Sequence, residues 1–133
     1  MAEVPRATAG AGLWIMTAGF LAVSVLIETA YSWLGGLTDP YYLVKVAGWV
    51  LLASGATHLR KLRPETGLAL LAGGWGWLAA NFWRAVADRV SDLAAGQTLR
   101  LGSIELWFAG SCLLVSLAGL AWSLALASRR HSP

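Results

Sequence analysis

The sequence predicts an all-α integral membrane protein, a four-helix bundle formed by one transmembrane domain, residues 1–133. The first observation is that only 13% of the 133 residues are charged, whereas soluble domains carry about 25% charged residues. The second is that 57% of the residues are hydrophobic, with a mean hydropathy of +0.61. The third is that four apolar stretches each approach the roughly 20 residues that a helix needs to cross a bilayer. Because backbone polar groups in lipid must be bonded within their own segment, each stretch is predicted to be a helix.

The first two predicted spans cover residues 10–33 and 41–59. The first is interrupted only by Glu28 and is longer than the 7 to 15 apolar residues of a typical signal peptide, so we expect it to be retained. The second has Lys45 near its start. Thr38, Asp39 and Pro40 precede it and supply a capping residue followed by proline at the first helical position.

The third and fourth predicted spans cover residues 66–84 and 103–128. Pro64 precedes the third, and Ser103 is a plausible N-cap for the fourth. Between them, Val86, Val90 and Leu93 recur at helical spacing. This pattern predicts an amphipathic helical extension of the third span, which Gly96 would end.

The distribution of lysine and arginine favours an orientation with both termini inside the cell. In that orientation six cations lie inside and four lie outside. The inner set includes a compact basic turn, His58 to Arg63, which we interpret as a topology determinant. Binding of anionic lipid headgroups by this turn is the alternative interpretation.

Polar side chains gather near the outer ends of all four predicted spans. Ionisable residues inside a membrane are costly, so they are functional candidates by default. This polar cluster consists of Glu28, Lys45, Asn81, Arg84 and Glu105. We expect Lys45 to pair with one of the two acids and Arg84 to pair with the other. The favoured interpretation is a structural network, and the alternative is a shallow pocket for a small solute, a proton or a quinone headgroup.

Below Glu105, the fourth span predicts a packing stripe of small and weakly polar side chains at helical spacing. Such residues let membrane helices approach closely. The stripe consists of Cys112, Ser116, Gly119 and Ser123. Cys112 is accordingly interpreted as a packing residue and not as a nucleophile. Four tryptophans lie deeper than the membrane interface and are expected to face lipid or another subunit: Trp49, Trp75, Trp77 and Trp122.

The sequence offers little for a cofactor. One cysteine allows neither an internal disulfide nor a thiolate metal cluster, and we expect no metal site. His58 lies at a helix end and His131 in the tail, so we do not expect haem. We expect bound lipid and no nucleic acid. Residues 40–48, continuing to Ser54 and Gly55, resemble the second helix of small DoxX-like four-helix membrane proteins, over about 16 residues, and this resemblance implies no function.

These observations predict a membrane protein that acts by association. Its expected role is a non-catalytic accessory subunit of a larger membrane complex, or a homo-oligomer, with other transmembrane subunits or a second copy as partners. The alternatives are a small transporter or channel component that uses Glu28 and Glu105, and a membrane site for a quinone or another lipophilic cofactor. An enzyme ranks below these because no nucleophile, base and orienting group converge in the sequence. The expected location is a bacterial inner or plasma membrane.

Overall fold

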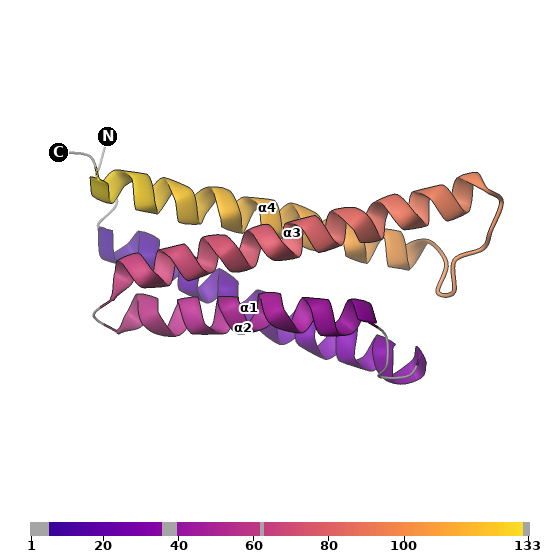
Figure 1. The fold of residues 1–133 in the computed structure, drawn as a ribbon, viewed down its shortest axis with the longest axis horizontal. Coiled ribbons are helices and arrows are strands. Elements are labelled where there is room, and N and C mark those ends of the chain that lie inside the picture. Colours follow the sequence, from indigo (N-terminus) through magenta and orange to yellow (C-terminus); the bar gives the residue numbers. More distant parts are fainter. Residues whose placement is uncertain (1–5, 36–39, 62, 132–133) are drawn as a thin grey trace.

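The computed structural model describes residues 6–35, 40–61 and 63–131, and these residues form four helices. The helices are α1 (Arg6–Gly35), α2 (Pro40–Arg60), α3 (Pro64–Ala94) and α4 (Ser103–His131). Figure 1 shows them side by side, with each helix running opposite to the one before it. The first turn of α1, the last turn of α4 and the adjoining ends of α2 and α3 lie at one end of the bundle, and the other ends of the four helices lie opposite them.

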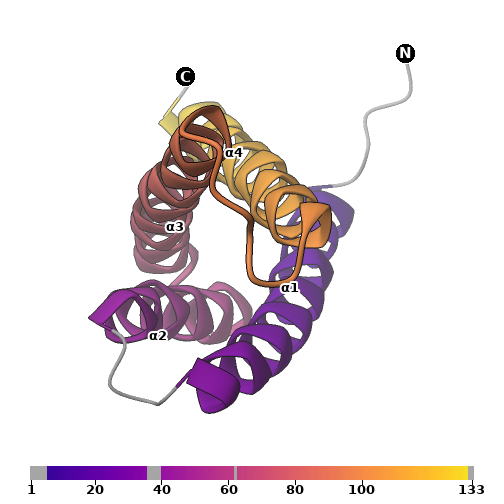
Figure 2. The ribbon, with the colours of Figure 1, turned by 90° about the vertical axis from the view of Figure 1, so that its right-hand side faces the viewer.

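Seen from one end, the helices form a ring in chain order (Figure 2). Helix α3 packs closely against α2 and α4, whereas α1 packs less extensively against the same two helices. Helix α3 also supplies most of the largest core side chains. The fully buried apolar core consists of Leu13, Leu52, Leu71, Trp75, Leu78 and Phe82.

Three of the four described helices are long and apolar enough to cross a membrane. They are α1, α2 and α4, over Gly10–Trp33, Tyr42–Arg60 and Ser103–Arg130. The third predicted span, in α3, does not reach the same hydropathy, because residues 66–84 contain four glycines, three tryptophans and an asparagine. The all-helical class is therefore confirmed, whereas the span in α3, and with it the bundle of four spans, stays a prediction.

Glycines bring α3 into close contact with both of its neighbours. A Cβ atom on Gly67 would lie 2.6 Å from the backbone nitrogen of Leu59 in α2. On the other side, a Cβ atom on Gly119 of α4 would lie 2.4 Å from the indole ring of Trp75. The other three residues of the predicted packing stripe are buried along the same helix: Cys112, Ser116 and Ser123.

The expected positions of the deep tryptophans are wrong for two of the four. Trp49 is 6% exposed and Trp75 is fully buried, so both pack inside this chain's own bundle. The reason is visible at each site: the ring of Trp75 occupies the space that glycine leaves at Gly119, and Trp49 Nε1 donates a hydrogen bond of 3.2 Å to Ser24 Oγ in α1. Trp77 and Trp122 keep exposed fractions of 46% and 36%.

The extension of the third helix is confirmed, since α3 continues without a break to Ala94. Gly96 ends it with a φ of 78°, in the left-handed region that glycine adopts at low cost. The Gly96 N–H donates to the Leu93 carbonyl over 3.0 Å, and the Gln97 N–H donates to the Asp92 carbonyl over 2.9 Å. These two bonds form a Schellman motif and satisfy carbonyls at the helix end.

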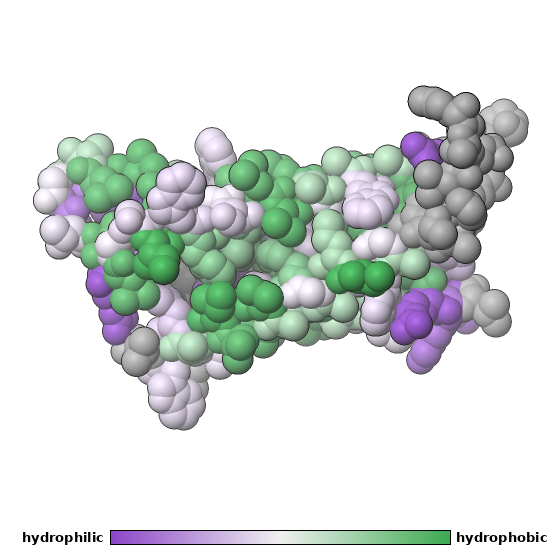
Figure 3. All heavy atoms as spheres, turned by 180° about the vertical axis from the view of Figure 1, so that it is seen from behind, coloured by the Kyte–Doolittle hydropathy of each residue, from purple (hydrophilic) through white to green (hydrophobic). Residues whose placement is uncertain are grey.

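The surface divides into an apolar middle and hydrophilic ends. On the face shown in Figure 3, apolar side chains and pale aromatic ones cover the length of the helices, and strongly hydrophilic residues gather at the two ends. This pattern suits a bundle whose middle lies in lipid. At the start of α2, Pro40 is the first helical residue, while the predicted caps Thr38 and Asp39 lie outside the described residues.

Candidate functional site

A cavity of about 510 Å³ lies at the end of the bundle where the α3–α4 connection folds back. All four helices and that connection contribute to its wall. We call it the charged cavity, after the ionisable side chains that line it: Glu28, Lys45, Asp88, Arg89, Asp92, Arg100 and Glu105. Four carboxylates and three cations thus meet in one hollow, together with Asn81, Tyr31 and Phe108.

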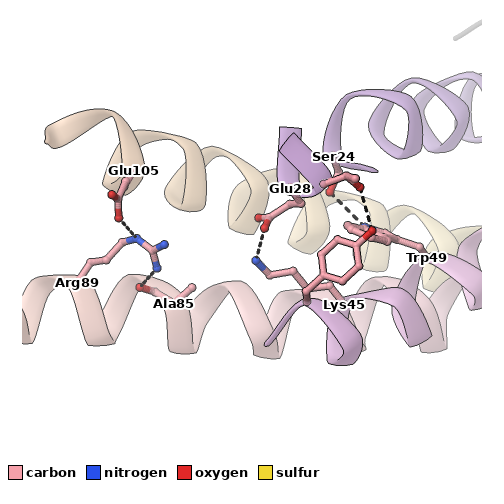
Figure 4. A network of polar contacts seen from close by, with 9 residues as sticks. Ser24, Glu28, Lys45, Trp49, Ala85, Arg89 and Glu105 are labelled. Atoms are coloured by element: carbon pink, nitrogen blue, oxygen red, sulfur yellow. Dashed lines mark hydrogen bonds and ion pairs between the residues drawn. The ribbon is translucent and has the colours of Figure 1, made fainter. Parts of the chain in front are cut away.

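The first buried ion pair of the cavity joins α1 to α2. Lys45 Nζ lies 2.7 Å from Glu28 Oε2, and the two side chains are only 12% and 9% exposed. The ammonium group also lies 5.2 Å from the centre of the Phe82 ring, a favourable cation–π contact. Figure 4 shows the two side chains directed toward each other. This is one of the two pairings that the sequence allowed for Lys45.

The second ion pair joins α3 to α4. Arg89 Nε donates to Glu105 Oε2 over 3.2 Å, and Arg89 Nη1 donates to the Ala85 carbonyl over 3.0 Å (Figure 4). The other carboxylate oxygen of Glu105 accepts a hydrogen bond of 2.6 Å from the Leu101 N–H. Glu105 lies in the first turn of α4, where the helix dipole also favours a negative charge. It therefore fixes the connection against the bundle.

The predicted pairing of Arg84 with an intramembrane acid is wrong. Arg84 Nε lies 3.9 Å from Oδ2 of Asp88, one turn further along the same helix, and both side chains are more than half exposed. The reason is helical geometry: five residues separate Arg84 from Arg89, which rotates the second side chain by about 140° and directs it toward α4. Arg84 consequently does not belong to the charged cavity, whereas Glu28, Lys45, Asn81 and Glu105 do.

Two further side chains of the cavity come from α3 and from the α3–α4 connection. Asn81 lines it, and its side-chain amide donates to the Trp77 carbonyl over 2.8 Å. Arg100 comes from the connection, and its guanidinium lies 5.8 Å from the centre of the Tyr31 ring in α1. No signal in the sequence placed a residue of the connection over the first helix.

Sequence reasoning missed the contribution of the α3 extension to the site. Val86, Val90 and Leu93 indicated only the apolar side of this extension, whereas three of its charged residues line the cavity: Asp88, Arg89 and Asp92. Their spacing carries a usable signal, since residues four apart share a helix face and Asp88 and Asp92 therefore lie together. Within the described ranges, no three His, Cys, Asp or Glu side chains are placed to hold a metal ion together.

Comparison with known proteins gives one similarity to a named enzyme. No family model matches the chain, and no solved structure does. The chain is similar to the adenosylcobinamide-GDP ribazoletransferase of Pseudomonas putida (strain W619), with 29% identity over 142 residues. The alignment covers 86% of this chain and 56% of that protein. The chain thus spans about half the length of the curated relative it matches.

This similarity corrects the functional interpretation drawn from the sequence. The matched protein is a transferase, so the interpretation as a non-catalytic accessory subunit is wrong. The sequence alone showed no sign of an enzyme because the polar residues of the cavity come from four helices and a connection. Residues so far apart in the chain form no local motif. With three helices that are long and apolar enough to cross a membrane and a bacterial relative, the chain is an integral inner-membrane protein.

Proposed function

We propose that this chain is a membrane transferase whose charged cavity binds a phosphate-bearing substrate during ribazole transfer to adenosylcobinamide-GDP. One observation carries the proposal: a cavity of about 510 Å³ with seven ionisable side chains lies at one end of the bundle, in a chain similar to a ribazoletransferase. The volume falls within the range of roughly 300 to 1,000 Å³ that is typical of ligand pockets.

The proposal includes four membrane spans in a single domain. Helix α3 has 31 residues and is therefore about 46 Å long, more than the bilayer core of about 30 Å. Residues 66–83 contain no charged side chain. An even number of spans places both termini on one side of the membrane, which agrees with their position at the same end of the bundle (Figure 1).

The cations of the cavity support recognition of a diphosphate. Arginine binds phosphate oxygens through its planar set of N–H donors. Arg89 and Lys45 each pair with a buried acid. Arg100 belongs to neither of these two pairs and lies in the connection, with its guanidinium 5.8 Å from the centre of the Tyr31 ring. A phosphate can therefore meet Arg100 without breaking either buried pair.

The proposed transfer is a single displacement at phosphorus. A ribazole hydroxyl oxygen forms a bond to the phosphorus nearest the cobinamide, the bond from that phosphorus to the bridging oxygen breaks, and GMP leaves with the electron pair. The hydroxyl proton passes to water or to a carboxylate of the cavity. In phosphoryl transfer the protein contributes mainly positioning and charge stabilisation, and Arg100 supplies positive charge there.

The test is ribazole transfer by the purified chain in liposomes, with adenosylcobinamide-GDP and ribazole as reactants and mass spectrometry of the products. Arg100→Gln removes a charged hydrogen-bond donor, so we expect KM for adenosylcobinamide-GDP to rise by about 10- to 100-fold. The matched control is Arg129→Gln, an exposed arginine at the opposite end of the bundle, for which KM stays unchanged. The proposal fails if wild type forms no product, or if both variants change KM equally.

A further inference from the structure

A second hollow, of about 450 Å³, lies at the opposite end of the bundle from the charged cavity. Three helices form it: the first turns of α1 and the last turns of α2 and α4. Its lining combines apolar and aromatic side chains with two arginines, and it consists of Gly10, Ala11, Trp14, Ile15, Leu59, Arg60 and Arg130. We call it the basic hollow.

The charge around this hollow is mainly positive. At this end the described residues of the turn and of the last turns of α4 include five cations, Arg60, Lys61, Arg63, Arg129 and Arg130, and one acid, Glu65. Among the residues that the structure describes, no carboxylate lines the hollow. The charged cavity differs, because each of its buried cations has an acid as partner. The basic hollow therefore carries positive charge that a ligand can neutralise.

Arg60 is held in a defined position by an aromatic ring. Its guanidinium carbon lies 4.4 Å from the centre of the Trp14 ring, a cation–π contact between α2 and α1. Stacking on the ring leaves the edge N–H groups of the guanidinium available as donors. Arg130 reaches the same hollow from α4, so two guanidinium groups from different helices converge on it.

The apolar part of the lining continues into the membrane. Ile15 follows Trp14 on α1 and is 65% exposed, and both belong to the predicted span that begins at Gly10. Tryptophan is typical of the headgroup level of a bilayer. Basic pockets between transmembrane helices at this level are suited to anionic lipid headgroups. A free phosphate ion would leave the apolar wall unused, whereas a phospholipid contacts both parts.

We propose that the basic hollow is a binding site for an anionic phospholipid, with its phosphate between Arg60 and Arg130 and its acyl chains along the first turns of α1. This site lies at the other end of the molecule from the charged cavity and is independent of the proposed transfer reaction. The proposed site names an anionic lipid and the two arginines that bind its phosphate. The sequence alone suggested only that the basic turn from His58 to Arg63 could attract anionic headgroups.

The test is native mass spectrometry of the purified chain in detergent, titrated with phosphatidylglycerol and, separately, with phosphatidylcholine. We expect phosphatidylglycerol to bind and phosphatidylcholine to bind at least tenfold more weakly. Replacing both arginines, by Arg60→Gln with Arg130→Gln, weakens phosphatidylglycerol binding about thirtyfold, given about 1 kcal/mol for each cation near a membrane surface. Arg130→Gln alone, which leaves the Trp14 contact intact, weakens it about fivefold.

The control is Arg129→Gln, which removes an equal charge from the neighbouring position outside the lining and leaves phosphatidylglycerol binding within twofold of wild type. Equal loss in the Arg129 and Arg130 variants would overturn the site in favour of general charge attraction. Equal binding of phosphatidylcholine would overturn its charge selectivity. Displacement of phosphatidylglycerol by millimolar inorganic phosphate would show a free-anion site and overturn the lipid assignment.

Discussion

Glu105 is the residue on which the geometry of the charged cavity depends most. Its two oxygens accept hydrogen bonds from Arg89 in α3 and from the backbone of Leu101 in the connection. The sequence identified Glu105 as a member of the cluster and allowed Glu28 as one of two partners for Lys45, because an acid and a base at matching depth in adjacent spans are expected to meet. It missed Arg89, because which side of a long helix faces the neighbouring helix is decided by packing and not by the local pattern.

We predict that Glu105→Gln lowers the free energy of unfolding by about 1 to 3 kcal/mol, the cost of losing charged hydrogen bonds and leaving Arg89 without its acid. The matched comparison is Arg84→Gln, which removes an exposed pair within one helix and is expected to change stability by less than about 0.5 kcal/mol. Unfolding of both variants in detergent, followed by circular dichroism, measures the difference. Equal stabilities would show that the buried pair does not hold the connection.

At the scale of elements, the helices and the end of the longest one follow from sequence, but their lateral packing does not. Gly96 ends α3 as expected, since a helix C-terminus needs a left-handed residue that glycine supplies. The burial of Trp75 was not predicted, because a large ring fits there only through the missing side chain of Gly119 on another helix. Such complementarity between two helices leaves no pattern within either one.

Helix α3 should accordingly tolerate a methyl group at one glycine and not at another. Gly67→Ala places its Cβ against the backbone of α2, which must move away, at a cost of about 1 to 3 kcal/mol. Gly73→Ala lies on the same helix with open space at its Cβ position and should raise stability by up to about 1 kcal/mol. Thermal unfolding of the two variants provides the comparison. The close packing of α2 and α3 is contradicted if Gly67→Ala is as stable as Gly73→Ala.

At the scale of the whole molecule, two arguments about orientation lead to opposite expectations. The excess of cations at the end that carries the termini places that end inside the cell and the charged cavity outside. A substrate that carries a nucleotide and is supplied from the cytoplasm requires the cavity to face inward. The cation bias can be read from the sequence by counting charges in the loops. The side that the cavity faces cannot, because the cavity forms only in the folded bundle.

The single cysteine makes this orientation measurable. In a Cys112→Ala background, Gln97→Cys places a thiol in the exposed α3–α4 connection, and Arg129→Cys places one at the opposite end. A membrane-impermeant maleimide applied to intact cells or spheroplasts then distinguishes the two. The cation bias predicts labelling at position 97 and none at position 129. Labelling at position 129 alone would contradict that orientation and place the charged cavity on the cytoplasmic side.

Photo-crosslinking measures whether the charged cavity holds the nucleotide-bearing substrate. A photoreactive GDP analogue, irradiated with the membrane-embedded chain and mapped by peptide mass spectrometry, reports where a guanosine diphosphate group binds. The account predicts crosslinks to the connection around Arg100 and to Tyr31, both of which line the cavity, and their loss when excess adenosylcobinamide-GDP is added. Crosslinks confined to the basic hollow around Arg60 and Arg130, or insensitive to that competitor, would contradict it.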